Sequence, residues 1–180
     1  MNRYVLFYGM ALAASLDASS GIIIAHLLCL VFAKAPTLLI YAVGAGAALL
    51  PDVSIPMWLC LPKHIAPTHH RDVTHYPLLV ISIFTTVVWF SVFWASVISA
   101  CLLAHFIDDT ADPGGLAWLA PFSGKKYRIL NAETEPLKLE DWLRQYYLRP
   151  TVKSVLAVIL SAIAVIIVGS QLYRQIFWAP

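Results

Sequence analysis

Uncharged apolar stretches dominate the chain and define its expected elements. Residues 77–104 and 154–173 contain no Asp, Glu, Lys or Arg, and neither does the shorter stretch 35–51. A helix needs roughly 20 apolar residues to cross a bilayer, and the two longer stretches reach that length. The pattern therefore predicts an integral membrane protein.

The interruptions between these stretches predict where helices begin and end. We expect no strands, because no segment alternates apolar and polar residues with the period of a strand. The first helix should weaken near residues 17–21, and four prolines mark residues 51–76 as a loop. The expected helices cover residues 4–33, 37–50, 77–110, 137–148 and 151–177, and residues 111–150 form a polar loop that contains the short helix.

Composition and charge agree with this interpretation. The chain has 180 residues, of which 60% are hydrophobic and 12% are charged, and its mean hydropathy is +0.76. We expect one domain over residues 1–180, an all-α helix bundle embedded in the membrane. The net charge of +2 suggests no nucleic-acid partner. Loop 111–150 holds six Lys or Arg residues, so the positive-inside rule places it in the cytoplasm.

Polar residues inside this apolar chain carry the candidate chemistry. His105 and Asp109 in "AHFIDDT" are four residues apart, so on a helix they share one face with Cβ atoms about 5–6 Å apart. That spacing allows an imidazole and a carboxylate to bind one cation. Asp108 competes for the same role, and Asp109 could instead orient His105 through a hydrogen bond. Ionisable groups in membrane segments are costly, and they usually pair with one another or mark function.

A second polar cluster is "THHRDVTHY", residues 68–76. His70 and His75 could converge in a loop or at a helix start, beside Asp52 at the end of "LLPD". Nitrogen and carboxylate ligands together suit Zn²⁺ or a similar divalent ion. Arg71 could bind a phosphate or carboxylate through two hydrogen bonds, or it could form a salt bridge with a nearby aspartate.

A metal site shared by His75 and His105 requires the chain between them to fold back on itself. The two residues are 30 positions apart, and one unbroken helix of that length spans about 45 Å. We therefore expect residues 77–104 to fold back as two short antiparallel helices that turn near residues 89–94. Each half would span about 20 Å, too short to cross a core of about 30 Å alone. No Gly or Pro marks this turn, so the prediction depends on the chemistry of the site.

These motifs resemble the YdjM-like family of bacterial inner-membrane metal-dependent hydrolases. The resemblance covers about residues 20–130 and lies in "LLPD" at 49–52, "HRDVTH" at 70–75 and "AHFIDDTADPGGLAWLAPF" at 104–122. The residues that match the motifs of the family are Pro51, Asp52, His70, Arg71, Thr74, His75, His105, Asp109, Pro113, Gly115 and Pro121.

The family is more distantly similar to zinc-dependent phospholipases C and fungal zinc nucleases. In those all-helical enzymes an Asp, a His and an HxxxD pair share one zinc ion. Two positions depart from the PDxDH pattern of the family, because Ser54 and Ile55 replace an acid and a histidine, and this favours one metal ion over several. The ligand set that the resemblance implies is Asp52, His75 or His70, His105 and Asp109.

His26 is a further candidate ligand. The family has a histidine at the start of its first helix, where Ile22 stands here if "VFAKA" sets the register. His26 lies one helical turn later on the same face and could take over that role. It could equally be a core histidine that is bonded to a carbonyl group. Asp17 could face the site as well.

The sequence favours a membrane-bound hydrolase that acts on a phosphoester or lipid-linked substrate through a metal-activated water. Arg71 would neutralise the developing anion, and Asp108 or Asp112 would act as general base. We expect the protein in the bacterial inner membrane, multi-pass or deeply embedded. A site near one membrane surface suggests a phospholipid-like substrate. The alternative is a non-catalytic membrane protein whose His/Asp cluster binds a metal for structure, sensing or transport.

Overall fold

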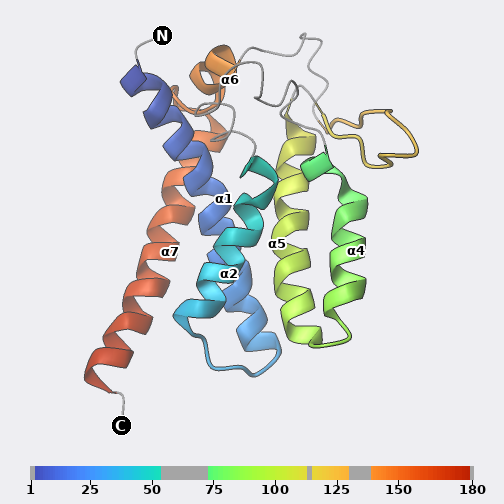
Figure 1. Cartoon of the computed structure of the whole chain (residues 1–180). Coiled ribbons are helices and arrows are strands. Elements are labelled where there is room, and N and C mark those ends of the chain that lie inside the picture. The colour runs from blue at the N-terminus through green and yellow to red at the C-terminus, as the bar shows by residue number, and fades with distance from the viewer. Residues whose placement is uncertain (1–2, 54–72, 113–114, 130–138, 179–180) are drawn as a thin grey trace.

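The described part of the chain is a bundle of helices, with the N- and C-terminal ends at opposite ends of the bundle (Figure 1). A computed structural model describes residues 3–53, 73–112, 115–129 and 139–178. These residues form no β-strand, only an isolated bridge between Leu116 and Tyr127, so the predicted all-α fold is confirmed. The elements are α1 (Arg3–Val31), α2 (Leu38–Leu49), the short 3-10 helices η1 (Leu50–Val53) and η2 (Val73–His75), α4 (Pro77–Val87), α5 (Val92–Ala111), α6 (Leu139–Tyr146) and α7 (Val152–Phe177).

Three of these helices are long and apolar enough to cross a membrane. They are α1 over Phe7–Val31, α5 over its full length and α7 over its full length. Helix α7 lies on the outside of the bundle and exposes most of its apolar side chains, as a helix that faces lipid does. The predicted membrane protein is confirmed by these spans.

Helix α1 is continuous, so the weak point predicted at residues 17–21 was wrong. The polar side chains there have partners that leave the helix intact. The Ser20 hydroxyl donates to the Leu16 carbonyl oxygen at 2.8 Å, one turn earlier, and the Ser19 hydroxyl lies 3.1 Å from that of Ser161 in α7. Asp17 faces His105 in α5. Polar groups that are satisfied in this way cost little, so they do not break a helix.

The hairpin predicted for residues 77–104 is confirmed as α4 and α5, which lie side by side (Figure 1). Its two arms are unequal. Helix α4 has 11 residues and spans about 16 Å, but α5 has 20 residues and spans about 30 Å, so the prediction that both arms are too short to cross the core was wrong for α5.

The turn between α4 and α5 needs no glycine. None of residues 88–91 has a positive φ angle, so ordinary side chains fit there. Ser91 is the N-cap of α5, and its hydroxyl oxygen accepts a hydrogen bond from the Trp94 amide at 3.3 Å. This serine is the local signal for the turn, because serine is a favoured N-cap residue.

Helices α1 and α2 cross in backbone contact at two glycines. A Cβ atom on Gly21 would lie 2.3 Å from the Gly44 carbonyl oxygen, and one on Gly44 would lie 2.5 Å from the Gly21 oxygen. Small residues permit such an approach between helices in a membrane. The buried core packs around this crossing and includes Ala25 and Val97. This close contact between α1 and α2 places the end of α2, and η1 after it, against α5, the helix that contains His105 and Asp109.

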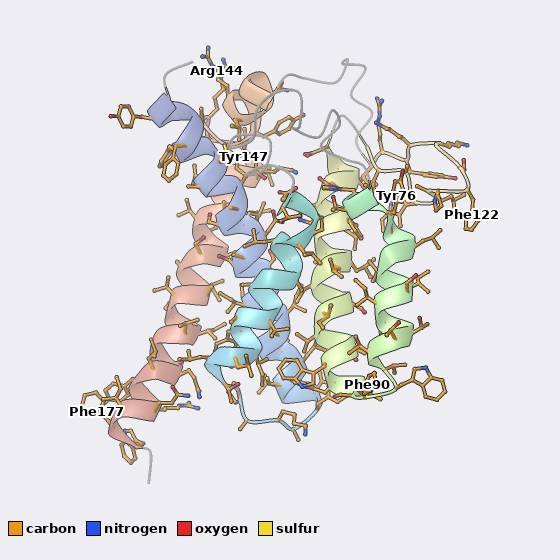
Figure 2. The ribbon with its side chains drawn as sticks, viewed as in Figure 1. Tyr76, Phe90, Phe122, Arg144, Tyr147 and Phe177 are labelled. Atoms are coloured by element: carbon orange, nitrogen blue, oxygen red, sulfur yellow. The ribbon has the colours of Figure 1, made fainter. Side chains whose placement is uncertain are left out.

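Aromatic side chains gather at both ends of the bundle. Figure 2 shows Phe90 and Phe177 at one end and Tyr76 and Phe122 at the other. Phe90 and Phe122 are both 87% exposed. Aromatic residues are enriched at the two membrane–water interfaces, so these two levels mark the expected interfaces. The 3-10 helices η1 and η2 lie toward the end that carries Tyr76.

Candidate metal centre

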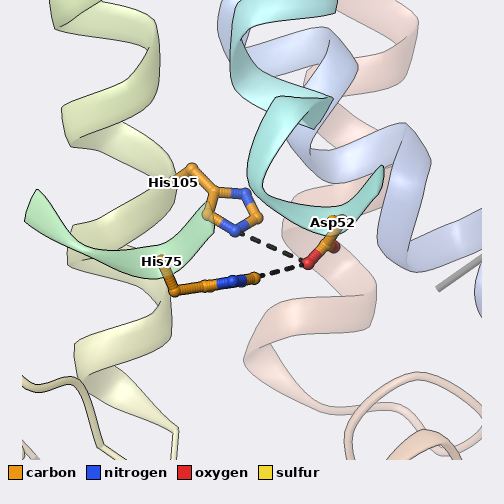
Figure 3. Close-up of side chains that lie close together, drawn as sticks. All are labelled: Asp52, His75 and His105. Carbon is orange, nitrogen blue, oxygen red and sulfur yellow. Dashed lines mark ion pairs between the residues drawn. The ribbon is translucent and has the colours of Figure 1, made fainter. Parts of the chain in front are cut away.

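Three separate segments bring candidate ligands to one place. Asp52 lies in η1, His75 ends η2, and His105 and Asp109 lie one turn apart on α5. The rings of His75 and His105 have centroids 5.6 Å apart, because the hairpin returns the chain to its starting level. Figure 3 shows both rings directed toward the Asp52 carboxylate. Residues that are distant in the sequence thus meet as the HxxxD and HRxxTH motifs predict.

The His–Asp distances match the spacing of neighbouring ligands around one metal ion, and Asp52, His75 and His105 each place a donor atom within 4.8 Å of the other two. His75 Nε2 lies 3.4 Å from Asp52 Oδ1 and 3.3 Å from Asp109 Oδ2. His105 Nε2 lies 3.7 Å from the same Asp52 oxygen and 3.6 Å from the same Asp109 oxygen. Bonds of 2.0–2.2 Å from zinc to nitrogen and oxygen put tetrahedral ligands about 3.3 to 3.6 Å from one another. The donor set and its spacing therefore fit one divalent ion.

The centre is buried, with an opening at Asp52. His75 is 1% exposed and His105 is 5% exposed, whereas the Asp52 side chain keeps 22% of its surface accessible. Both ring nitrogens of His105 are buried, and among the described residues their polar contacts are ion pairs with Asp17, Asp52 and Asp109 at 3.3–3.7 Å. Buried polar atoms nearly always have partners, so these nitrogens suit a bound cation on one side and a carboxylate on the other.

Asp17 lies behind His105 and was only a marginal candidate in the sequence. Its Oδ1 atom is 3.3 Å from His105 Nδ1, on the side of the ring opposite the other ligands. A carboxylate in this position fixes the orientation and the tautomer of a metal-binding histidine. The sequence signal was an ionisable residue in an apolar helix, which needs a partner.

Lys153 joins α7 to the site and was not found from the sequence. Its Nζ atom donates to Asp108 Oδ2 at 2.8 Å and to Asp112 Oδ1 at 2.6 Å. Asp112 is 2% exposed, and the Asp108 side chain is 35% exposed. Both candidate general bases are therefore ion-paired, and Asp108 is the one that water can reach.

Tyr147 lies in the loop between α6 and α7 and packs in a buried apolar cluster with Leu143 of α6 and Leu16 of α1. It is buried, and burial together with the nearby carboxylates of Asp108 and Asp17 raises the pKa of its phenol. The phenol therefore stays protonated at neutral pH.

The structure does not group His26 with the other candidate ligands. His26 lies nine residues beyond Asp17 on α1, about 13 Å along the helix. Its Nδ1 atom is 2.8 Å from the Tyr41 hydroxyl, so it is a partly buried histidine whose partner is a side chain rather than a carbonyl group. His70 and Arg71 lie outside the described residues, as do Ser54 and Ile55. Cys29 and Cys101 are buried free thiols.

Comparison with protein families covers nearly the whole chain. Residues 16–176 match the family described as YdjM inner membrane protein. The chain belongs to the YdjM family. The match includes Asp17 and all four residues of the candidate metal centre, and so extends well beyond the motifs around residues 49–122. No curated protein and no solved structure gives a significant match to this YdjM-family chain.

Proposed function

We propose that this YdjM-family protein is a metal-dependent hydrolase of the bacterial inner membrane that cleaves a phosphoester bond in a lipid-linked substrate. The observation that carries the proposal is the convergence of Asp52, His75, His105 and Asp109, with donor atoms 3.3–3.7 Å apart, inside a membrane-spanning bundle. In the hydrolysis, a water oxygen bonds to phosphorus, the bond to the leaving alcohol oxygen breaks, and the alcohol receives a proton.

Zn²⁺ is the proposed ion, because two imidazole nitrogens and two carboxylate oxygens suit it. When bound, such an ion lowers the pKa of a water and polarises a phosphoryl oxygen. Asp52, His75, His105 and Asp109 would hold it, and Asp17 would orient His105.

Other residues of the chain would handle the proton and the charge. Asp108 is the better candidate for general base, since it is partly exposed, whereas Asp112 is buried against Lys153. Arg71 is proposed to neutralise the phosphoryl anion, because it precedes His75 by four residues and carries a fixed positive charge.

The test is hydrolysis of a chromogenic phosphodiester by the purified, zinc-loaded full chain. We expect activity in the wild type and its loss in His105→Ala. The matched control is His26→Ala, which removes an imidazole from α1 outside the cluster and should retain activity. Circular dichroism and thermal unfolding must show that both variants fold. Equal activity in the wild type and His105→Ala would contradict the proposal.

A closed structural metal site is the second candidate. Four protein donors would complete a tetrahedron if all of them bound the ion, whereas catalytic zinc sites keep a position open for water or substrate. X-ray absorption separates the two functions. A fifth ligand from solvent supports the hydrolase, and a four-coordinate site in an inactive, folded protein supports the structural role.

A further inference from the structure

A cavity lies beside the metal centre, between α1, α5 and α7. Its volume is about 170 Å³. Asp17, His105 and Asp108 form its polar wall, and all three belong to the site or its surroundings. The cavity therefore shares one wall residue, His105, with the candidate metal centre.

Apart from Ser20, whose hydroxyl donates to the Leu16 carbonyl oxygen of its own helix, the rest of the cavity wall is apolar. Leu16 of α1, Cys101 of α5, and Leu156 and Leu160 of α7 line it. Leu16 and Cys101 are buried, but Leu156 is 42% exposed on a helix that faces lipid. Two lining residues reach the outer surface, namely Leu156 on α7 and Asp108, whose side chain is 35% exposed. One side of the cavity thus lies toward the lipid-facing surface of α7, and the other lies toward the water-accessible Asp108.

The two ends of the cavity match the two parts of a phospholipid-like molecule. The polar end includes His105, one of the proposed zinc ligands, and the apolar end includes Leu156 on the lipid-facing helix α7. A volume of about 170 Å³ exceeds that of a few water molecules at about 30 Å³ each, but it lies below the range of about 300–1,000 Å³ for whole small ligands. It therefore fits the first carbons of one chain, while the remainder of the chain stays in the membrane.

We propose that this cavity binds the part of a lipid chain nearest the phosphate, so that the substrate enters sideways from the bilayer between α5 and α7. The inference rests on the proposed hydrolase function and names its substrate as a lipid that stays in the membrane. Lys153 joins α7 to Asp108 and Asp112 at the level of the site, and would thereby hold the entrance open at a fixed width.

Photo-crosslinking tests the subsite without any need for turnover. The full chain, loaded with zinc, is placed in phosphatidylethanolamine–phosphatidylglycerol vesicles that contain phosphatidic acid with a diazirine near the glycerol end of one chain. We expect labelling of Leu16 and Cys101, which surface lipid cannot reach because both are buried. Leu156→Trp should abolish this labelling by filling the entrance. Ile159→Trp is the matched control, since Ile159 is 48% exposed on the same helix but does not line the cavity.

Kinetics give a second readout with the same two variants. Leu156→Trp should lower kcat/KM for a long-chain phosphoester by about tenfold, the effect of displacing about two methylene groups from an apolar wall, and leave a short water-soluble phosphoester unchanged. Ile159→Trp should change neither.

The outcomes separate the subsite from the hydrolase. Labelling of Leu16 and Cys101 without any hydrolysis would support the lipid subsite and contradict the proposed function. Hydrolysis that does not depend on chain length, with labelling only of exposed residues on α7, would overturn the subsite and leave the hydrolase standing.

Discussion

The carboxylate of Asp17 lies 3.3 Å from Nδ1 of His105, and the two residues come from different membrane-spanning helices. The contact leaves Nε2 of His105 directed at Asp52 and Asp109. Helix α1, which supplies none of the four proposed ligands, thereby controls the geometry of one of them.

Replacing Asp17 should weaken metal binding without removing a ligand. Asp17→Asn keeps the size of the side chain but removes the charge that orients His105, and we expect zinc affinity to fall by about 10- to 100-fold. Competition with a chelator of known affinity measures the change. Ser15→Ala on the same helix is the control, since its hydroxyl donates to its own helix at the Leu12 carbonyl. Equal affinities in the two variants would refute the role of Asp17.

Metal content should distinguish the three described histidines. His75→Ala and His105→Ala should each lose the zinc ion, whereas His26→Ala should keep it. The last variant loses the hydrogen bond to Tyr41, which should cost about 1 kcal/mol of unfolding free energy. Elemental analysis after dialysis gives the stoichiometry. Retention of zinc in His105→Ala would place the metal elsewhere.

Removing Lys153 should destabilise the bundle more than its position near a helix end suggests. Lys153→Met leaves the buried Asp112 carboxylate without this cation, and breaking such a pair costs about 3 kcal/mol. Thermal unfolding in detergent measures the loss. Adding Asp112→Asn to Lys153→Met should restore part of the stability, because the uncompensated charge is then gone. No recovery in the double variant would mean that Lys153 acts through packing alone.

The glycines of α2 should respond in opposite directions to one added methyl group. Gly44→Ala puts a Cβ atom 2.5 Å from the Gly21 carbonyl oxygen and should destabilise the protein by about 1–3 kcal/mol through overpacking. Gly46→Ala meets nothing within 4 Å and should stabilise the helix by about 0.5–1 kcal/mol. Unfolding transitions of the two variants, measured side by side, check both signs.

The positive-inside rule predicts that the metal centre lies on the cytoplasmic side of the membrane. Lys125, Lys126 and Arg128 lie in the loop after α5, and this loop is at the end of the bundle that carries the site. In a background without native cysteines, Ser123→Cys should react with an impermeant thiol reagent only after the membrane is opened. Trp89→Cys, in the turn at the other end, should react from outside. The reverse pattern would place the site on the periplasmic side.

The fold could be predicted largely from the distribution of apolar residues, because long uncharged stretches in a membrane have few alternatives to a helix. The hairpin was less obvious, since its turn contains neither Gly nor Pro. We predicted it because His75 must reach His105. The N-cap hydrogen bond from the Trp94 amide to the Ser91 hydroxyl accounts for the start of α5 directly after the turn. The lengths of the two arms could not be predicted, because an uncharged stretch does not show where inside it a helix ends.

The ligands of the candidate centre could be proposed from spacing, but their supports could not. The i, i+4 spacing of His105 and Asp109 follows from helix geometry alone. The position of Asp17 beside His105 depends on how α1 packs in the bundle, and no local spacing encodes that packing. Lys153 looked like an ordinary residue at the start of the last helix, and only the tertiary fold brings it to Asp112.

Helix α4 is about half as long as the hydrocarbon core is thick. Its two ends lie at the two aromatic levels, one at Tyr76 and the other at the turn that contains Phe90, so beside α4 these levels are closer together than an unperturbed core is thick. Hydrophobic mismatch of this kind is relieved when the bilayer thins locally beside the short element. Thinning beside α4 would lower the plane of lipid phosphates toward His75. The membrane itself would then carry phosphate groups down to the depth of the metal centre, and no lipid would have to be lifted out to meet it.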